Sequence, residues 1–258
     1  MYSERNPPIL ELDSLGFRYF KDKPFINDLN FSVGDGELIG LLGANGSGKS
    51  TILKLASGIL RPAEGQIKLW GKPLHLYKNK DRAKLLCYLP QLLDINLPFK
   101  VRELVSMGLY PYDIPPEIRV DEALEMVGLL EKSESNITNL SGGERRRAFI
   151  AMTLIQGAGL LLLDEPLANL DIKYQLEIQR LLRELRVKKN ISIIMALHDI
   201  NFALQFDKVM LLKEGKILGI GKPETVLTND LLKEALDVNL EIKREDSGGT
   251  FISYGNNF

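Results

Sequence analysis

The 258-residue sequence contains one cysteine, two histidines and almost no net charge. Cys87 alone cannot form an internal disulfide or a multi-cysteine zinc site, and we interpret it as a small buried apolar residue. The 33 basic and 34 acidic residues give a formal charge of −1, so no general attraction to nucleic acid or anionic lipid is expected. No apolar run approaches the ~20 residues that span a bilayer, and no secretory signal opens the sequence. We therefore expect a globular protein of a reducing cytosol, held at any membrane by another chain.

Segments typical of strands and of helices alternate along the chain. Two nearly continuous apolar runs, at 160–164 and 191–199, have the length of parallel strands covered on both faces. A turn signal at Gly34–Gly36 separates two further predicted strands. The alternation predicts an α/β core. Helical spacing fits residues 49–58, 101–108, 120–130, 144–157 and 172–189.

The segment GANGSGKST at 43–51 matches the pattern GxxxxGK[ST] between a predicted strand and a predicted helix. Its glycines allow consecutive N–H groups to surround an anion, and the helix adds its positive end. Lys49 would reach the β- and γ-phosphates, and Ser50 would hold Mg²⁺. The alternative is a glycine-rich turn without a ligand, which the flanking elements disfavour. The predicted phosphate-binding residues are Gly43, Ala44, Asn45, Gly46, Ser47, Gly48, Lys49, Ser50 and Thr51.

Two carboxylates, Asp164 and Glu165, follow the apolar run that begins at Leu160. An acid at the end of a central strand, beside a phosphate-binding loop, can take up Mg²⁺, and we assign this role to Asp164. The chain turns at the strand's end, so Glu165 can face the γ-phosphate and position or deprotonate water. The alternative is a pair of capping acids that opens a loop.

With these motifs in place, the chain resembles the ATP-binding-cassette ATPases from about Gly16 to about Leu227. The resemblance implies ATP hydrolysis with ATP and Mg²⁺ as cofactors. It also implies an α/β P-loop NTPase (RecA-like) core with an antiparallel β portion and an inserted α-helical subdomain. The motifs occur in the family's order: GANGSGKST at 43–51, LPQ at 89–91, LSGGE at 140–144, LLLLDEP at 160–166, LANLD at 167–171 and ALHD at 196–199.

The resemblance adds site residues outside the phosphate loop. Tyr19 occupies the position at which the family stacks an aromatic ring on adenine, although Phe17 would point to the same face. Gln91 would touch Mg²⁺ or water, and His198 would sense the γ-phosphate. The signature motif would contact a nucleotide held by a second copy of the chain, so that two ATP molecules lie between two protomers. The nucleotide-binding residues implied in this way are Tyr19, Ser141, Gly142, Gly143 and Asp171.

Three parts of the chain are predicted: the first part of the nucleotide-binding core at 1–90, a helical subdomain at 91–157, and the rest of the core with a carboxyl-terminal extension at 158–258. We interpret the arginines at 145–147 as a solvated helix face. Glu144 stands where the family usually has glutamine, and LANLD replaces the common TSALD; neither departure removes a phosphate or metal ligand. The segment GGTFISYG near the carboxyl terminus is predicted to be a hairpin or a strand end.

Two longer stretches resemble the subfamily that imports iron–siderophore, haem and cobalamin. These are LPFKVRELVSMGLYP at 97–111 and the segment at 207–236, although Leu109 and Tyr112 stand where arginine and histidine are usual. Importers of zinc, manganese or molybdate share much of both. The implied protein is an importer's ATPase subunit at the cytoplasmic face of the cell membrane. Its implied partners are a second copy of itself, two integral membrane permease subunits and a substrate-binding protein, with no nucleic acid.

The alternative from another class is a soluble cassette ATPase, such as one of iron–sulfur cluster assembly. That family has a similar size and basic residues after SGGE, as this chain has. Its acid motif usually reads DESDSGLD, whereas this chain has DEPLANLD. Ribosome-associated cassette proteins carry two cassettes per chain, and this sequence contains one. These comparisons favour the importer.

Overall fold

The computed structural model describes residues 7–91, 97–114, 119–244 and 250–254. The chain divides into two compact units. The first unit spans residues 1–74 and 194–258, and the second spans residues 75–193. Each unit buries its own set of large apolar side chains, such as Leu10 and Leu41 in the first and Leu104 in the second.

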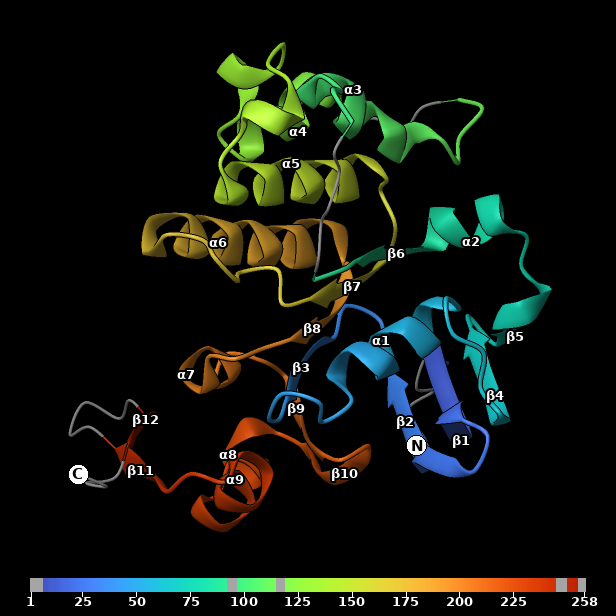
Figure 1. Ribbon diagram of the computed structural model, residues 1–258, viewed down its shortest axis with the longest axis vertical. Coiled ribbons are helices and arrows are strands. Elements are labelled where there is room, and N and C mark those ends of the chain that lie inside the picture. Colours follow the sequence, from blue (N-terminus) through green and yellow to red (C-terminus); the bar gives the residue numbers. More distant parts are fainter. Residues whose placement is uncertain (1–6, 92–96, 115–118, 245–249, 255–258) are drawn as a thin grey trace, which may run out of the picture. The chain divides into compact units, whose positions relative to one another are not determined.

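An antiparallel four-stranded sheet forms one part of the first unit (Figure 1). Its strands pair in the order β2-β1-β4-β5, with Leu10 opposite Val33 and opposite Leu69. Apolar residues of β1 are buried at alternate positions near its start, as a half-covered strand requires. The sheet is the predicted antiparallel β portion, which is thereby confirmed. Its strands are β1 (Leu10–Phe20), β2 (Lys23–Val33), β4 (Glu64–Leu69) and β5 (Lys72–Pro73).

Three further strands of the first unit, β3, β9 and β10, lie beside the loop at residues 43–48. Strand β3 (Leu38–Leu42) is buried at all five positions and runs parallel to β9 (Lys208–Lys213). Strand β10 (Lys216–Gly221) pairs with β9 in the antiparallel sense. Helix α1 (Lys49–Ser57) follows β3 after the loop and ends at Gly58, whose φ of 75° is in the left-handed region. Strand, loop and helix thus follow each other in the order that the sequence predicts.

Three short helices and a hairpin complete the first unit. Helices α7 (Ile200–Ala203), α8 (Pro223–Val226) and α9 (Asn229–Leu236) connect or follow its strands. Strands β11 (Leu240–Arg244) and β12 (Thr250–Tyr254) form an antiparallel pair. The predicted strand end in GGTFISYG is confirmed at Thr250–Tyr254, while the glycines at 248, 249 and 255 lie outside the described residues.

Helix α5 is central to the second unit, and Figure 1 shows α3 and α4 along one side of it. Strand β6 runs parallel to β7, with Leu86 opposite Leu160. Strand β8 (Ser192–Ala196) crosses the division between the units, which falls after Ile193. The helices and strands of the second unit are α2 (Asn79–Leu85), β6 (Leu86–Leu89), α3 (Val101–Ser106), α4 (Val120–Met126), α5 (Gly142–Ile155), β7 (Leu160–Asp164) and α6 (Ile172–Lys189).

Helix α6 has the predicted bounds, whereas α4 does not. The prediction of a helix through residue 130 is wrong for its last residues, because α4 ends at Met126. Gly128 has a φ of 64°, and its N–H donates to the carbonyl of Glu125 at 3.0 Å. A glycine in this conformation closes the helix and turns the chain away. Helix α5 begins at Gly142, two residues earlier than predicted.

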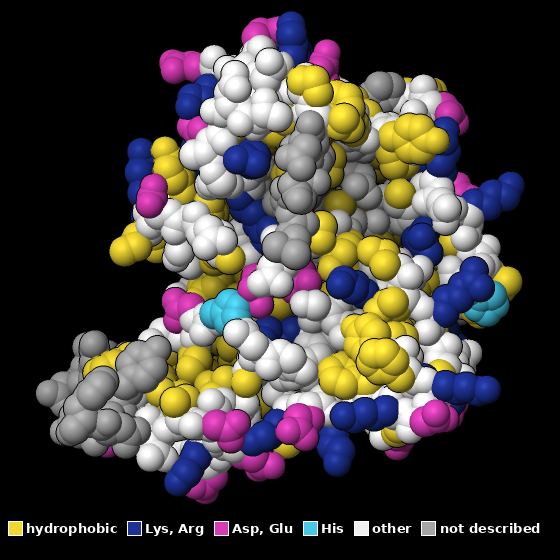
Figure 2. All heavy atoms as spheres, viewed as in Figure 1, with side chains coloured by type: hydrophobic (Ala, Val, Ile, Leu, Met, Phe, Trp, Pro, Cys, Tyr) yellow, Lys and Arg dark blue, Asp and Glu magenta, His cyan; other side chains and the backbone are white. Residues whose placement is uncertain are grey.

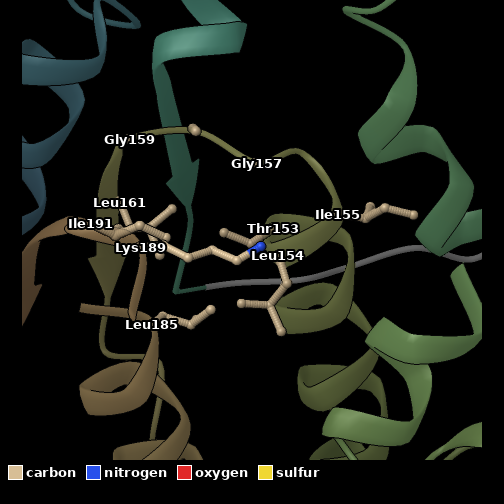
Figure 3. Close-up of a pocket in the computed structure, with 10 residues that line it drawn as sticks. Thr153, Leu154, Ile155, Gly157, Gly159, Leu161, Leu185, Lys189 and Ile191 are labelled. Carbon is tan, nitrogen blue, oxygen red and sulfur yellow. The ribbon is translucent and has the colours of Figure 1, made fainter. Parts of the chain in front are cut away.

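A largely apolar cavity of about 390 Å³ lies in the second unit, between the ends of α5 and α6 and strand β7. Figure 3 shows the side chain of Lys189 extending across it toward α5. The described residues that line it include none of the predicted site residues. Within the part of the chain that the structure describes, no helix is long and apolar enough to cross a membrane. Both signs of charge are interspersed over the face in Figure 2, as the near-zero net charge leads one to expect.

Candidate nucleotide-binding site

The loop between β3 and α1 has a backbone that only glycine fits at its first position. Gly43 has a φ of 153°, and a Cβ atom there would lie 2.5 Å from Ser47 Oγ and collide with the carbonyl of Leu212. Gly48, which precedes α1, has a φ of 113°. The loop is closed by a hydrogen bond from Ser47 N to Ala44 O at 3.1 Å. The glycines of the motif are therefore required by backbone conformation and close approach.

Two buried polar groups show what this loop is built to hold. Lys49 is buried, and its Nζ donates to the carbonyls of Gly43 at 2.7 Å and Ala44 at 3.2 Å, so the amine curls over the loop. Ser47 Oγ is buried and has no hydrogen-bond partner among the described residues. The first N–H groups of α1 have no partner within the helix. An amine, a hydroxyl and a helix amino terminus at one loop fit a polyphosphate.

Tyr19 and Phe17, the two rings considered for stacking on adenine, differ in how far they are exposed. Tyr19 is 54% exposed, whereas Phe17 is 8% exposed and belongs to the core. Their rings meet edge to face at 4.8 Å, and Phe25 lies 5.7 Å from Tyr19. The Tyr19 hydroxyl is 2.8 Å from Thr51 Oγ1 in the first turn of α1. Of these two rings, Tyr19 is therefore the one that is exposed for a base to stack on.

His198 follows β8 in the first unit and is exposed. The N–H of Leu197 donates to Leu41 O at 2.9 Å, which attaches this segment to β3, the strand that leads into the phosphate loop. Asp199 caps α7 by accepting from the N–H groups of Asn201 at 2.8 Å and Phe202 at 3.1 Å. The histidine is thus held between a strand end and a capped turn.

The acid pair and Gln91 come together in the second unit. Asp164 ends β7 and is buried, and it accepts a hydrogen bond from the Tyr88 hydroxyl at 3.2 Å. Glu165 has a left-handed φ of 51°, and its Oε2 accepts from Gln91 Nε2 at 2.6 Å. Sequence reasoning placed Gln91 and Glu165 in one site without predicting this bond. Sequence reasoning missed Tyr88, which could have been suspected only because it lies three residues before Gln91.

The signature motif forms the amino-terminal cap of α5. The Ser141 N–H donates to Glu144 Oε2 at 3.0 Å, and the Glu144 N–H donates to Ser141 Oγ at 3.3 Å, which is a capping box. Lys132 Nζ lies 2.5 Å from Glu144 Oε1. The Lys132 hydrogen bond, followed by that from the Ser141 backbone, holds the pKa of Glu144 below its usual range. Gly142 has open space where a side chain would be, and Asp171 is the exposed residue before α6.

The predicted solvated face at 145–147 is wrong for two of its three arginines. Arg146 and Arg147 are only 6% and 4% exposed. Arg147 Nη1 donates to the carbonyls of Val127 at 2.6 Å and Gly128 at 3.2 Å. Arg146 donates to the backbone carbonyls of Gln91 and Glu165. Buried carbonyls beyond the ends of strands and helices need donors, and these two side chains supply them.

The predicted site residues thus fall into two groups, one in each unit. The first contains the phosphate loop at 43–51 with Tyr19 and His198. The second contains Gln91, Asp164, Glu165, Asp171 and the signature residues Ser141, Gly142 and Gly143. A buried strand, a glycine-rich loop with a buried lysine and a helix in direct succession define a P-loop nucleotide-binding protein.

Comparisons with known proteins place the chain more narrowly. The family model described as ABC transporter matches residues 26–168, more than half of the chain. The chain is 41% identical over 241 residues to the iron(3+)-hydroxamate import ATP-binding protein FhuC of Bacillus subtilis (strain 168), covering 90% of this chain and 89% of that protein. It is 35% identical over 237 residues to the hemin import ATP-binding protein HmuV of Rhodopseudomonas palustris (strain BisA53), covering 88% and 87%.

Among solved structures, one described as a metal-chelate type ABC transporter in an inward-facing conformation aligns with a TM-score of 0.78. The identity is 26%, and the alignment covers 96% of this chain and 97% of that one. The chain belongs to the ABC transporter family. It is an ABC ATPase, a subunit that hydrolyses ATP to drive transport. The predicted family, fold and class of enzyme are confirmed.

Proposed function

We propose that this chain is the ATPase subunit of an importer of metal chelates of the siderophore, haem or cobalamin class. The observation that carries the proposal is the 41% identity to an iron-hydroxamate import ATP-binding protein along nine-tenths of the chain. The phosphate loop supports the ATPase part of this proposal, since Lys49 and Ser47 are buried around a loop that fits a polyphosphate. The identity of the chelate would be set by other chains of the transporter.

Residues of the phosphate loop, with Tyr19, Gln91 and Asp164, would bind ATP and its Mg²⁺. The phosphate loop would hold the phosphates, with Lys49 at the β- and γ-positions, and Tyr19 would stack on the adenine. Bound Mg²⁺ would neutralise charge on the phosphates, and its ligands would be Ser50, Gln91 and Asp164. Oxygen donors of this kind suit a hard divalent cation.

Glu165 is the residue that we propose for activating water. Its carboxylate is oriented by the 2.6 Å hydrogen bond from Gln91. From that position it would orient or deprotonate a water molecule for attack on the γ-phosphate. His198 would contact the γ-phosphate from the first unit. Glu165 and His198 would thus complete the catalytic group that also contains Lys49 and Gln91.

A second copy of the chain would complete each site. Ser141 caps α5, Gly142 and Gly143 begin it, and Gly142 is exposed with open space where a Cβ atom would lie. A capped helix start with exposed N–H groups is suited to a phosphate that approaches from outside the chain. ATP would therefore close a homodimer with its γ-phosphates between protomers, and hydrolysis would open it. Asp171, exposed before α6, would lie at the same interface.

The segment 91–157 would be the helical subdomain that contacts two integral membrane permease subunits. Its surface carries several exposed large apolar side chains. Where such side chains lie together they mark an interaction site, whereas isolated ones do not. Hydrophobic side chains over the α3 region are visible in Figure 2. The chain would then work at the cytoplasmic face of the membrane, with a substrate-binding protein on the other side. The exposed large apolar residues in the described part of this segment are Leu97, Met107, Tyr110, Ile114, Met126 and Leu130.

A trapping experiment tests this proposal. Glu165→Gln should bind ATP, hydrolyse it at least 100-fold more slowly and form a dimer in size-exclusion chromatography with light scattering. The double variant Lys49→Ala/Glu165→Gln is the matched control, since it should stay monomeric with ATP. The trapped protein is then used to capture partners from native membranes, with identification by mass spectrometry. A polytopic permease is the expected partner; recovery of cluster-assembly proteins alone would overturn the importer and favour the soluble alternative.

A further inference from the structure

Arg146 makes hydrogen bonds with every donor of its guanidinium group. Nε donates to the carbonyl of Pro166 at 3.1 Å. Nη1 donates to Pro90 at 3.0 Å and Gln91 at 2.7 Å. Nη2 donates to Asp164 at 2.8 Å and also to Glu165. A guanidinium group has five N–H bonds, and all five end on backbone carbonyls of the second unit.

These five carbonyls belong to two segments that are far apart in the sequence. One follows β6 and contains Gln91, and the other begins with the last residue of β7 and contains Glu165. Because the guanidinium group is planar and rigid, its bonds fix the two segments relative to each other and to α5. The side chains of Gln91 and Glu165 are themselves joined at 2.6 Å. Their bond therefore depends on a distance that Arg146 sets.

The backbone at Glu165 needs such support. Its φ of 51° is a left-handed conformation, which a residue with a Cβ atom adopts only when its surroundings impose it. Arg146 binds the carbonyls on both sides of this residue as well as its own. Burial lowers the pKa of Arg146, while the charges of Asp164 and Glu165 oppose that shift. The buried cation is stabilised by the segment that it holds.

We propose that Arg146 is the positioning residue of the catalytic centre, holding Glu165 and Gln91 in register through their backbones. The inference rests on the proposed role of Glu165 in activating water. Arg146 lies five residues after Ser141 in α5, which corresponds to about 7.5 Å along a helix. One side chain therefore links the helix start that would contact the partner's nucleotide to the group that would act on the chain's own nucleotide.

Arg147 supplies a matched control on the same helix. It is equally buried and donates to two carbonyls, those of Val127 and Gly128, and its guanidinium lies 3.8 Å from the Tyr174 ring centroid. None of these groups belongs to the proposed site. Loss of Arg147 should therefore affect stability without a selective effect on hydrolysis.

The test compares Arg146→Lys, Arg146→Met and Arg147→Met in steady-state hydrolysis by the full chain at high protein concentration. Arg146→Lys keeps the charge but offers three donors from one atom, so it cannot reach all five carbonyls. We expect its kcat to fall at least 10-fold while the KM for ATP stays within threefold. Arg146→Met should lose more, and Arg147→Met should keep kcat within twofold although it unfolds at lower denaturant.

Hydrogen exchange supplies a measurement that does not depend on activity. In wild type the Ala168 N–H donates to Glu165 O at 3.2 Å. Peptides covering 160–170 should exchange faster in Arg146→Lys than in wild type or Arg147→Met. Unchanged exchange and kcat in Arg146→Lys would overturn the proposal, as would an equal loss of kcat in Arg147→Met. Glu165→Gln is measured in the same series: normal hydrolysis there would refute the role of Glu165 itself, whatever Arg146 does.

Discussion

The ion pair between Lys132 and Glu144 leads to a prediction about charge at the signature motif. Glu144 places a carboxylate beside a helix start that would receive the γ-phosphate of a partner-bound ATP. Lys132 lies 2.5 Å from that carboxylate, and Ser141 N–H bonds to its other oxygen. The Lys132–Glu144 pair itself therefore carries no net charge. Lys132→Ala should expose an unbalanced negative charge there, whereas Lys132→Ala/Glu144→Gln should remove both charges of the pair.

The structure sets the order of the effects. The Lys132 side chain is about half exposed, so loss of the ion pair alone should lower the free energy of unfolding by about 0.5 kcal/mol. Glu144→Ala also removes the capping bond and should cost about 1–2 kcal/mol. For ATP-dependent dimerisation, an unpaired carboxylate near phosphate should cost on the order of 1 kcal/mol, or about fivefold in affinity. Lys132→Ala should show this loss, and Lys132→Ala/Glu144→Gln should recover it.

Two assays check this reasoning. Dimer affinity is measured by analytical ultracentrifugation in the Glu165→Gln background with ATP, at low and high salt, because salt should weaken the effect. Stability is measured by urea unfolding between pH 7 and pH 4. The pKa of Glu144 is lowered in the folded state, so its contribution is present above its unfolded-state value of about 4.3 and is lost as the pH falls through the folded-state value. Equal dimer affinity in wild type and Lys132→Ala would refute the argument.

Three further predictions concern single side chains. Tyr19→Ala should weaken ATP binding, measured by calorimetry, by about 5- to 30-fold, because stacking is worth about 1–2 kcal/mol. Tyr19→Phe keeps the ring and should weaken binding by less than twofold. An unchanged affinity in Tyr19→Ala would contradict the stacking of adenine on Tyr19. Gly108→Ala should lower the free energy of unfolding by about 1–3 kcal/mol, because a Cβ atom there would collide with the Met152 carbonyl. Gly142→Ala should have little effect on stability, because there is open space for its Cβ atom. Equal stabilities of the two variants would be inconsistent with this packing. Burial raises the pKa of Cys87 to about 12, so a thiol reagent at pH 8 should label it only after unfolding, and rapid labelling of the native protein would disprove this.

Features that depend on neighbouring residues could be predicted from the sequence. The phosphate loop at 43–51 needs glycines at fixed offsets and a helix directly after it, and both conditions are local. The apolar run at 160–164 and helix α6 at 172–189 have the predicted bounds. A run of apolar residues and a helical spacing can both be recognised from consecutive residues. The helix predicted through residue 130 ends earlier, because the left-handed backbone at Gly128 prevents it from continuing although the apolar spacing is helical.

The tertiary structure decided what consecutive residues cannot encode. Tyr19 and Phe17 lie two residues apart, so the sequence places both rings on the same face. Only the packing of the β-sheet buries Phe17 and leaves Tyr19 exposed. Three arginines in a row are usually solvated, yet two of them are buried here. The partners of Arg146 lie up to 56 residues away in the chain, and they are backbone carbonyls that carry no sequence signal. The sequence by itself thus determined which groups can bind nucleotide, while the fold determined which of them are held in place, because that depends on distant backbone brought together by packing.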